Sequence, residues 1–291
     1  MKHKDKLPTF FQFKPQEHII TPYNIDWKNF KNYLYNKYSK NWAYLCFRYA
    51  LKYHELINNL SELETFNNDK RNNVLKALIA LAKYHGFYRE FKERIKDFGI
   101  KWTHSSSIDS FLRIFSNNNK NILAWYHKAI DILNDECSTY LKFQLMSGLR
   151  PREGINSFNL MRTRLDEYYN EEFGILEHFR FKDVFLRNTK NAFITIIPKS
   201  LITKIAKKNE VTYPMVQKKL QRNNMSVKIS QLRDYYATFM VRHGLIKEEV
   251  DLLQGRISES IFVRHYWSPA IKEFKQRVIK ALNELEKTIL S

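Results

Sequence analysis

The sequence predicts a mainly α-helical protein with a small β-sheet or hairpin, arranged as an N-terminal helical domain and a C-terminal α+β domain. Three observations predict this class. Apolar residues recur every three or four positions along most of the chain, as in amphipathic helices. Residues 174–198 depart from that spacing and alternate as strands do. A small polar run at residues 104–107 separates two helical series.

The N-terminal domain is expected to span residues 25–103. Residues 1–24 carry prolines and are expected to be irregular. Four helices are expected within the domain, over residues 27–34, 40–60, 70–86 and 88–98. Asn24 or Asp26 would cap the first helix, and Gly86 would end the third. These short helices together predict a small helical bundle.

A linker is expected at residues 104–110, followed by a C-terminal domain over residues 111–291. Within that domain, residues 205–222 fit either a helix-turn-helix or an amphipathic pair of helices. The last stretch, residues 267–291, has the spacing of an amphipathic helix. That helix would pack on its own domain or dock on a neighbouring protomer.

The hairpin is predicted from two alternating runs, residues 179–186 and 193–197. A polar tetrapeptide at residues 188–191 joins them, with Lys190 at the tip. We therefore expect an antiparallel pair of strands that presents a lysine on its turn.

The charge of the chain indicates a polyanionic partner. Lys and Arg number 49 against 30 Asp and Glu, a formal net charge of +19, with basic residues in both halves. DNA, RNA or an anionic membrane surface would attract such a protein. The aromatic, basic helices of residues 27–54 would lie against DNA, or else form a solvated face. The expected phosphate contacts are Lys28, Lys31, Lys37, Lys40, Arg48 and Lys52.

Several classes of protein are disfavoured. The two cysteines, Cys46 and Cys137, give neither a disulfide framework nor zinc spacing. The sequence has no glycine-rich phosphate loop and no His-Glu-x-x-His motif, so neither a metal nor a cofactor is expected. No apolar run approaches the roughly 20 residues of a membrane span, and no signal peptide is recognisable. A cytoplasmic protein without a membrane partner is expected.

Four segments carry residues suited to phosphodiester chemistry. Arg150 stands in Ser-Gly-Leu-Arg-Pro-Arg-Glu, Arg233 in Gln-Leu-Arg-Asp-Tyr-Tyr, Arg256 in Leu-Leu-Gln-Gly-Arg, and Tyr266 in Val-Arg-His-Tyr. Breaking a phosphodiester without a metal needs a nucleophile, stabilisation of the phosphoryl oxygens, and a proton for the leaving oxygen. Arginine suits the second task because its planar fork binds two oxygens and stays charged. Tyrosine can supply the nucleophile and Lys190 the proton.

These segments resemble the boxes of the tyrosine recombinase, or integrase, family, and most closely the fusellovirus-type integrases of archaeal viruses and plasmids. The resemblance lies in the order of the boxes and their spacing, with Tyr266 ten positions after Arg256. Arg256 stands where bacterial members usually have histidine. The helices of residues 25–103 also resemble the core-binding domain of the archaeal integrases.

The resemblance implies a site-specific recombinase that integrates or excises a mobile element. Tyr266 would attack the scissile phosphate and form a 3′-phosphotyrosine. Arg150, Arg233 and Arg256 would bind its non-bridging oxygens, and Lys190 would protonate the 5′-oxygen. The enzyme would act on double-stranded attachment sites as a homotetramer on synapsed DNA. It would be a monomer in free solution, in the cytoplasm of a prokaryotic cell or of the host of a virus or plasmid.

Two departures from the family pattern concern the cations of the site. The family usually has His or Lys three residues before the second arginine, and this chain has Ser230. A serine donates a hydrogen bond but carries no charge, so Lys228 or His265 would compensate, or the site would work with one cation fewer. Glu153 would orient a basic neighbour.

The turn lysine is not fixed by a motif. Lys190 fits the turn best, but Lys182 and Arg187 precede it and Lys199 follows it. Two further functions remain open. One is a catalytically inactive DNA-binding protein that keeps the fold, supported by Ser230. The other is a type IB topoisomerase, which shares the strand-cleavage chemistry.

Overall fold

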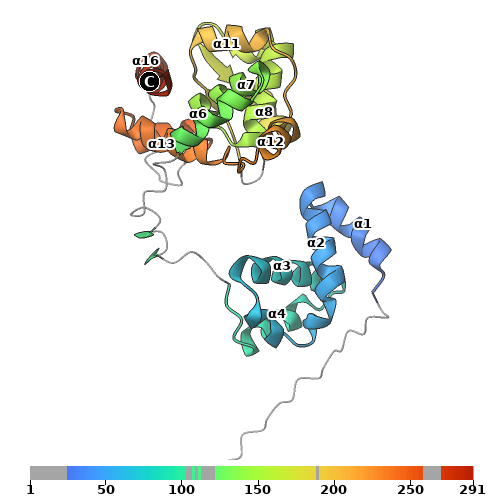
Figure 1. Cartoon of the computed structure of the whole chain (residues 1–291). Coiled ribbons are helices and arrows are strands. Elements are labelled where there is room, and N and C mark those ends of the chain that lie inside the picture. Colours follow the sequence, from blue (N-terminus) through green and yellow to red (C-terminus); the bar gives the residue numbers. More distant parts are fainter. Residues whose placement is uncertain are drawn as a thin grey trace, which may run out of the picture. The chain divides into compact units, whose positions relative to one another are not determined.

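The computed structural model describes residues 25–102, 107–108, 111–112, 122–187, 190–257 and 270–290. The chain divides into two compact units, residues 1–111 and 112–291 (Figure 1). The predicted class is confirmed, because the described elements are mainly helices with one small antiparallel sheet. The expected irregular segment 1–24 lies outside the described residues, as does the expected linker apart from residues 107–108.

The N-terminal unit is a helical bundle around a single apolar core. Its helices are α1 (Trp27–Lys37), α2 (Lys40–Tyr53), α3 (Asn68–Tyr84) and α4 (Tyr88–Asp97), with 3₁₀ turns η2 (His54–Ile57) and η3 (Ser61–Thr65). Helix α2 packs against both α1 and α3, and α4 packs against α3. Asp26 caps α1 by accepting a hydrogen bond from the Asn29 amide at 3.0 Å. Gly86, with φ of +84°, follows the end of α3 as predicted.

The second helix is shorter than the sequence predicts, so the expected span of residues 40–60 is wrong at its C-terminal end. Helix α2 ends at Tyr53, and two 3₁₀ turns follow. Ile57, Leu60 and Leu63 are all fully buried and lie three positions apart. Side chains three apart eclipse one another in 3₁₀ geometry, so these turns keep all three residues on the core side.

The C-terminal unit holds the remaining described elements. Its helices are α6 (Ile122–Ile132), α7 (Asp135–Ser147), α8 (Pro151–Thr163), α9 (Leu165–Tyr168), α10 (Lys182–Phe185), α11 (Lys199–Ala206), α12 (Tyr213–Arg222), α13 (Gln231–Arg242), α14 (Lys247–Leu253) and α16 (Ile271–Leu290). Helix α7 lies at the centre, packed against α6, α8, α11 and α13. Its last five residues, 143–147, are all buried, as expected of a helix inside a core.

The sheet has three short antiparallel strands in the order β1-β2-β3. They are β1 (Tyr169–Asn170), β2 (Ile175–Glu177) and β3 (Ile194–Thr195). Leu176 pairs with Tyr169 on one side and with Thr195 on the other. The segment between β2 and β3 carries the 3₁₀ turn η5 (His178–Arg180) and α10.

The predicted first strand of the hairpin, residues 179–186, is therefore wrong. Phe181 and Phe185 are four residues apart, a spacing that also fits one helical turn. Both rings pack on Tyr168, with ring centroids 5.4 and 6.1 Å away. Leu186 and Asn191 form an isolated antiparallel bridge on either side of the predicted polar turn, of which residues 188–189 lie outside the described residues.

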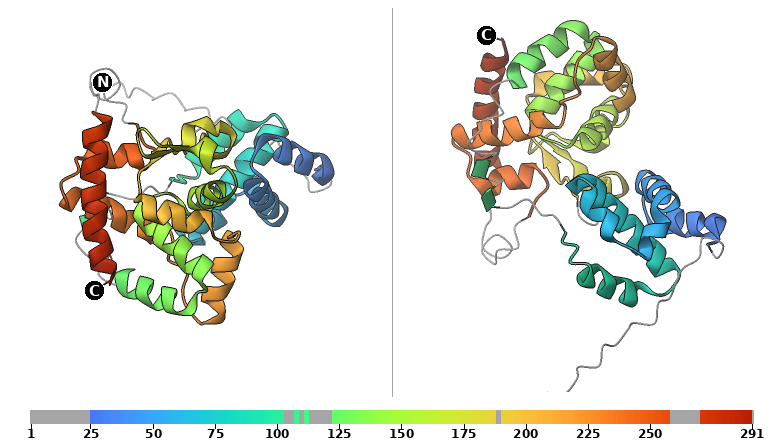
Figure 2. Two further views of the ribbon diagram at one scale, coloured as in Figure 1. Left: turned by 90° about the horizontal axis from the view of Figure 1, so that it is seen from above. Right: turned by 60° about the horizontal axis from the view of Figure 1, so that its bottom comes forward.

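Residues 205–222 include the end of α11 and all of α12, and both helices pack on α8 with buried apolar side chains. This packing fits the amphipathic pair, and the choice against a helix-turn-helix stays a prediction. Helix α16 packs across α13 (Figure 2) and buries Phe274, Val278 and Leu282 in the core of its own unit. Ion pairs from Arg277 to Glu249 and from Lys142 to Glu286 flank it.

Both thiols, Cys46 and Cys137, are free and buried, and burial raises the pKa of Cys46 to about 12. Within the described ranges, no helix combines the length and apolarity needed to cross a membrane. The same ranges contain no cluster of three or more His, Cys, Asp or Glu side chains suited to a metal ion.

Candidate active site

Arg150 lies in the connection between two core helices. Helix α7 ends at Ser147 and is followed by Gly148, whose φ of +63° turns the chain, and α8 begins directly after Arg150 with Pro151 at its first position. A side chain at Gly148 would collide with the Tyr236 ring, so the turn sits tightly on α13. The first arginine box is therefore fixed by the packing of three helices.

The guanidinium of Arg150 is held by two acceptors. Its Nη1 donates to Glu153 Oε1 at 2.8 Å and to the Asn191 carbonyl at 3.1 Å. The Arg150 amide donates to the other Glu153 oxygen, Oε2, at 3.1 Å. Glu153 is 1% exposed, and its carboxylate pairs with Arg150.

Arg233 joins the first and third arginine boxes. From α13, its Nη1 donates to the Gly148 carbonyl and its Nη2 to the Gln254 carbonyl, both at 2.8 Å. Gln254 returns a hydrogen bond from Nε2 to the Arg233 carbonyl at 3.0 Å. Arg233 is only 6% exposed. Its hydrogen bonds to the Gly148 and Gln254 carbonyls use two of the five N–H groups of the guanidinium.

Arg256 follows α14 at the surface. Its Nη1 lies 3.3 Å from Asp251 Oδ1, and its side chain is 55% exposed. Gly255, just before it, has φ of +70°, and a Cβ there would lie 1.7 Å from the Asn191 carbonyl oxygen. Only glycine permits this approach. The third box thus rests directly against the backbone segment that also contacts Arg150.

Arg150 and Arg256 both lie within electrostatic reach of Arg233. Burial first, and then the positive charges of Arg150 and Arg256, lower the pKa of Arg233 to about 10. Arg233 stays charged at neutral pH, so the cluster keeps an excess of positive charge. Such a cluster is suited to a phosphate or another oxyanion.

Lys190 lies beside this cluster. Its side chain is exposed, and its amide donates to the Arg187 carbonyl at 3.3 Å. The next residue, Asn191, contacts both Arg150 and Gly255. Lys190 is therefore one residue from the backbone on which two of the arginine boxes meet.

The other cations near the turn have different surroundings. Lys199 Nζ lies 2.9 Å from Glu171 Oε2, in an ion pair between α11 and the β1-β2 connection. Lys182 is exposed on α10. Arg187 donates from Nη2 to Glu153 Oε1 at 2.8 Å, on the same oxygen that Arg150 contacts. No sequence signal connects positions 34 residues apart, so the place of Arg187 in the cluster is not apparent from the sequence.

The accessory candidates are less engaged. Ser230 is exposed at the start of α13, and its side chain makes no capping hydrogen bond. Lys228, two residues earlier, is half-buried. His265 and Tyr266 lie outside the described residues. Arg150, Arg233 and Arg256 thus come together with Glu153, and Lys190 lies beside them.

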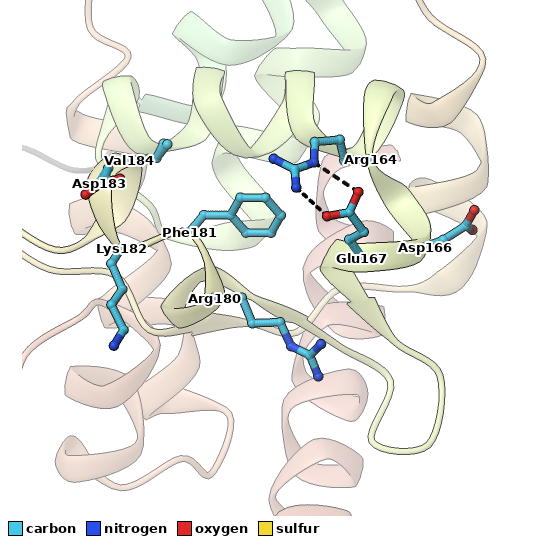
Figure 3. Close-up of a pocket in the computed structure, with 8 residues that line it drawn as sticks. All are labelled: Arg164, Asp166, Glu167, Arg180, Phe181, Lys182, Asp183 and Val184. Atoms are coloured by element: carbon cyan, nitrogen blue, oxygen red, sulfur yellow. Dashed lines mark hydrogen bonds and ion pairs between the residues drawn. The ribbon is translucent and has the colours of Figure 1, made fainter.

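A separate hollow of about 830 Å³ lies between α9 and α10. Arg164 stands 4.7 Å over the Phe181 ring and is paired with Glu167, and Lys182 points away from both (Figure 3). Its lining combines three basic and three acidic side chains, and it contains none of the three clustered arginines. A balanced lining gives no preference for an anion, so the arginine cluster is the candidate site.

A helical α+β unit that carries three convergent arginines is suited to binding a phosphate group. The comparison with known families is more specific, because residues 116–279 match the archaeal phage integrases. The chain belongs to this family and is an integrase that acts in DNA recombination. The matched region contains Arg150, Arg233, Arg256 and Tyr266, and the described part of the N-terminal unit precedes it. No curated protein matches the chain.

Proposed function

We propose that this integrase is a tyrosine recombinase that cleaves and rejoins DNA through a 3′-phosphotyrosine, without a metal or ATP. The observation that carries the proposal is the hydrogen-bonded convergence of Arg150, Arg233 and Arg256. Arg233 donates a hydrogen bond to the carbonyl of Gln254, which belongs to the third box. Arg150 donates to the Asn191 carbonyl, and Gly255 of the third box lies against the same carbonyl. A single phosphate with two non-bridging oxygens fits such a cluster.

In the proposed reaction, Tyr266 Oη attacks the scissile phosphorus in line with the departing 5′-oxygen. The three arginines stabilise the charge that grows on the non-bridging oxygens. The phosphorus–5′-oxygen bond breaks, and Lys190 gives that oxygen a proton. A 5′-hydroxyl from the partner strand then attacks the phosphotyrosine and releases Tyr266, so the number of phosphodiester bonds is conserved.

The N-terminal unit is proposed to hold the attachment site. Residues 27–53, which form α1 and α2, contain no Asp or Glu. Six cations on these helices are exposed: Lys28, Lys31, Lys37, Lys40, Arg48 and Lys52. A surface of one sign of charge suits the phosphate backbone of DNA. Two synapsed sites would bring four protomers together, and free protein would be monomeric and cytoplasmic.

The test is covalent trapping. Duplexes with a randomised centre and a nick beside it are incubated with the protein, because loss of a short cleaved fragment prevents religation. DNA that stays attached to protein in denaturant is then sequenced, which also reveals the attachment site. We expect an adduct with the wild type and none with Tyr266→Phe.

The alternatives give other outcomes. A catalytically inactive DNA-binding protein would retain duplexes without forming an adduct. A topoisomerase would form adducts with little sequence preference and relax supercoiled DNA. An adduct that survives Tyr266→Phe would reject Tyr266 as the nucleophile.

A further inference from the structure

Glu153 is shared between two arginines from different segments. Its Oε1 accepts from Arg150 Nη1 and from Arg187 Nη2, each at 2.8 Å. Oε2 accepts from the Arg150 amide. Because the carboxylate is 1% exposed, loss of either arginine leaves a buried charge with fewer partners. Glu153 therefore connects the start of α8 to the turn that follows α10.

Arg187 also begins the turn that carries Lys190. The Arg187 amide donates to Asn191 Oδ1 at 2.9 Å, and the Arg187 carbonyl accepts from the Lys190 amide at 3.3 Å. The bridge between Leu186 and Asn191 closes the turn. The backbone of Arg187 thus joins the two ends of the turn, and its side chain contacts Glu153.

Arg187 Nε is buried and has no hydrogen-bond partner among the described residues. The Arg187 side chain as a whole is 36% exposed. Its Nη2 contact with Glu153 places it beside Arg150 and the turn that carries Lys190. Arg187 is unsuited to donate a proton itself, since a guanidinium does not release a proton readily in proteins.

We propose that Arg187 is a positioning residue for Lys190. Through Glu153, it fixes the turn relative to Arg150, so that Lys190 reaches the 5′-oxygen of the phosphate that Arg150 binds. The inference depends on the proposed function, in which Arg150 binds phosphate and Lys190 donates the proton.

The experiment compares two leaving groups on the trapped attachment site. One nicked duplex carries the ordinary 5′-oxygen at the scissile phosphate, and the other carries a bridging 5′-sulfur. A departing thiolate needs no proton donor near neutral pH, because a thiol has a pKa of about 8.5. The sulfur substrate therefore removes the need for Lys190 but keeps the need for the arginines.

We expect Arg187→Ala to slow adduct formation on the oxygen substrate by at least about tenfold and to approach the wild-type rate on the sulfur substrate. Lys190→Ala should show the same pattern with a larger defect, and Arg150→Ala should be slow on both substrates. Arg187→Lys should restore part of the rate, because an ammonium can pair with Glu153 as a point charge.

Arg180→Ala is the matched control. Arg180 pairs with another buried carboxylate, that of Glu177, which is 5% exposed. Among the described hydrogen bonds, Glu177 contacts none of the three clustered arginines. This variant should cleave both substrates at the wild-type rate. Thermal unfolding of each variant, followed by circular dichroism, shows whether a lost rate reflects lost structure.

The outcomes separate the inference from the proposed function. An Arg187→Ala protein that is folded and slow on both substrates, or fast on both, would overturn the positioning role alone. A wild type that forms no adduct with either substrate would overturn the proposed function and this inference with it. A Lys190→Ala defect that sulfur does not relieve would remove Lys190 as the proton donor and the inference as well.

Discussion

Arg233 and Arg256 differ in how far the fold depends on each. Arg233 is 6% exposed and bridges the carbonyls of Gly148 and Gln254, whereas the Arg256 side chain is 55% exposed and pairs with Asp251. Both are proposed to bind the same phosphate. Substitution of Arg256 should therefore affect phosphate binding alone, whereas substitution of Arg233 should affect both phosphate binding and the stability of the fold.

Substitution by lysine tests this difference. Lysine keeps the charge but cannot span two carbonyls with one planar fork. We expect Arg233→Lys to lose about 1–3 kcal/mol of unfolding free energy, because a buried carbonyl loses its partner. Arg256→Lys should change it by less than about 0.5 kcal/mol. Urea denaturation measures both, and both variants should form less adduct.

Equal stability losses in the two lysine variants would contradict the assigned role of Arg233. An unchanged adduct rate in Arg256→Lys would remove Arg256 from the phosphate site.

The arginine cluster illustrates what the sequence alone can predict about a site. Arg150, Arg233 and Arg256 were predicted from short motifs in a defined order, and the structure brings them together. The partner of Arg187 was not predictable, because its contact with Glu153 depends on how two distant segments fold back on each other. Tyr266 lies outside the described residues, so its role stays a prediction.

At the scale of elements, the sequence predicted helices better than strands. Most helices of the N-terminal unit begin near the predicted residues, because each has several turns of apolar spacing. The strands hold only two or three residues each, which is too short for alternation to be read. Phe181 and Phe185 fit both periods, and packing on Tyr168 selected the helical turn.

A buried polar network holds these short elements together. Tyr168 at the end of α9 donates to Ser157 Oγ at 2.8 Å on α8, and its hydroxyl lies 2.5 Å from His178 Nδ1. His178 Nε2 lies 2.7 Å from Thr195 Oγ1 on β3. The ring of His178 is completely buried, and burial lowers its pKa to about 3.

The lowered pKa of His178 predicts how the free energy of unfolding depends on pH. The folded pKa lies below the unfolded value of 6.5, so the unfolded chain takes up the proton first as pH falls. The contribution of His178 to the unfolding free energy is complete above about pH 6.5 and is lost as the pH falls toward 3. By pH 5 the loss should be about 2 kcal/mol.

Urea denaturation at pH 7 and pH 5 measures this loss. His178→Gln cannot titrate and should reduce the difference between the two pH values by about that amount, although it lowers stability at pH 7. An equal pH dependence in wild type and variant would contradict the assignment.

At the scale of the whole molecule, charge is unevenly distributed within the N-terminal unit. Helices α1 and α2 carry exposed cations and no acidic residue. The following stretch, residues 54–69, contains four exposed acidic side chains and no Lys or Arg. The unit thus has one strongly basic part and one acidic part, which would orient it on a polyanion.

This distribution predicts how DNA affinity of the full chain depends on salt. Each phosphate contact contributes about −0.9 to the slope of log K against log salt concentration, because a bound cation releases a counterion. Replacing Lys40, Arg48 and Lys52 by alanine should therefore reduce the slope by about 2.7.

The matched control replaces Lys92 and Lys96, exposed cations of α4 that have Glu93 and Asp97 beside them in sequence, and should leave the slope nearly unchanged. Fluorescence anisotropy of a labelled duplex, titrated at several salt concentrations, gives both slopes. Equal slopes in the wild type and the α2 variant would show that α2 faces solvent, and a loss confined to the α4 variant would move the DNA contact to α4.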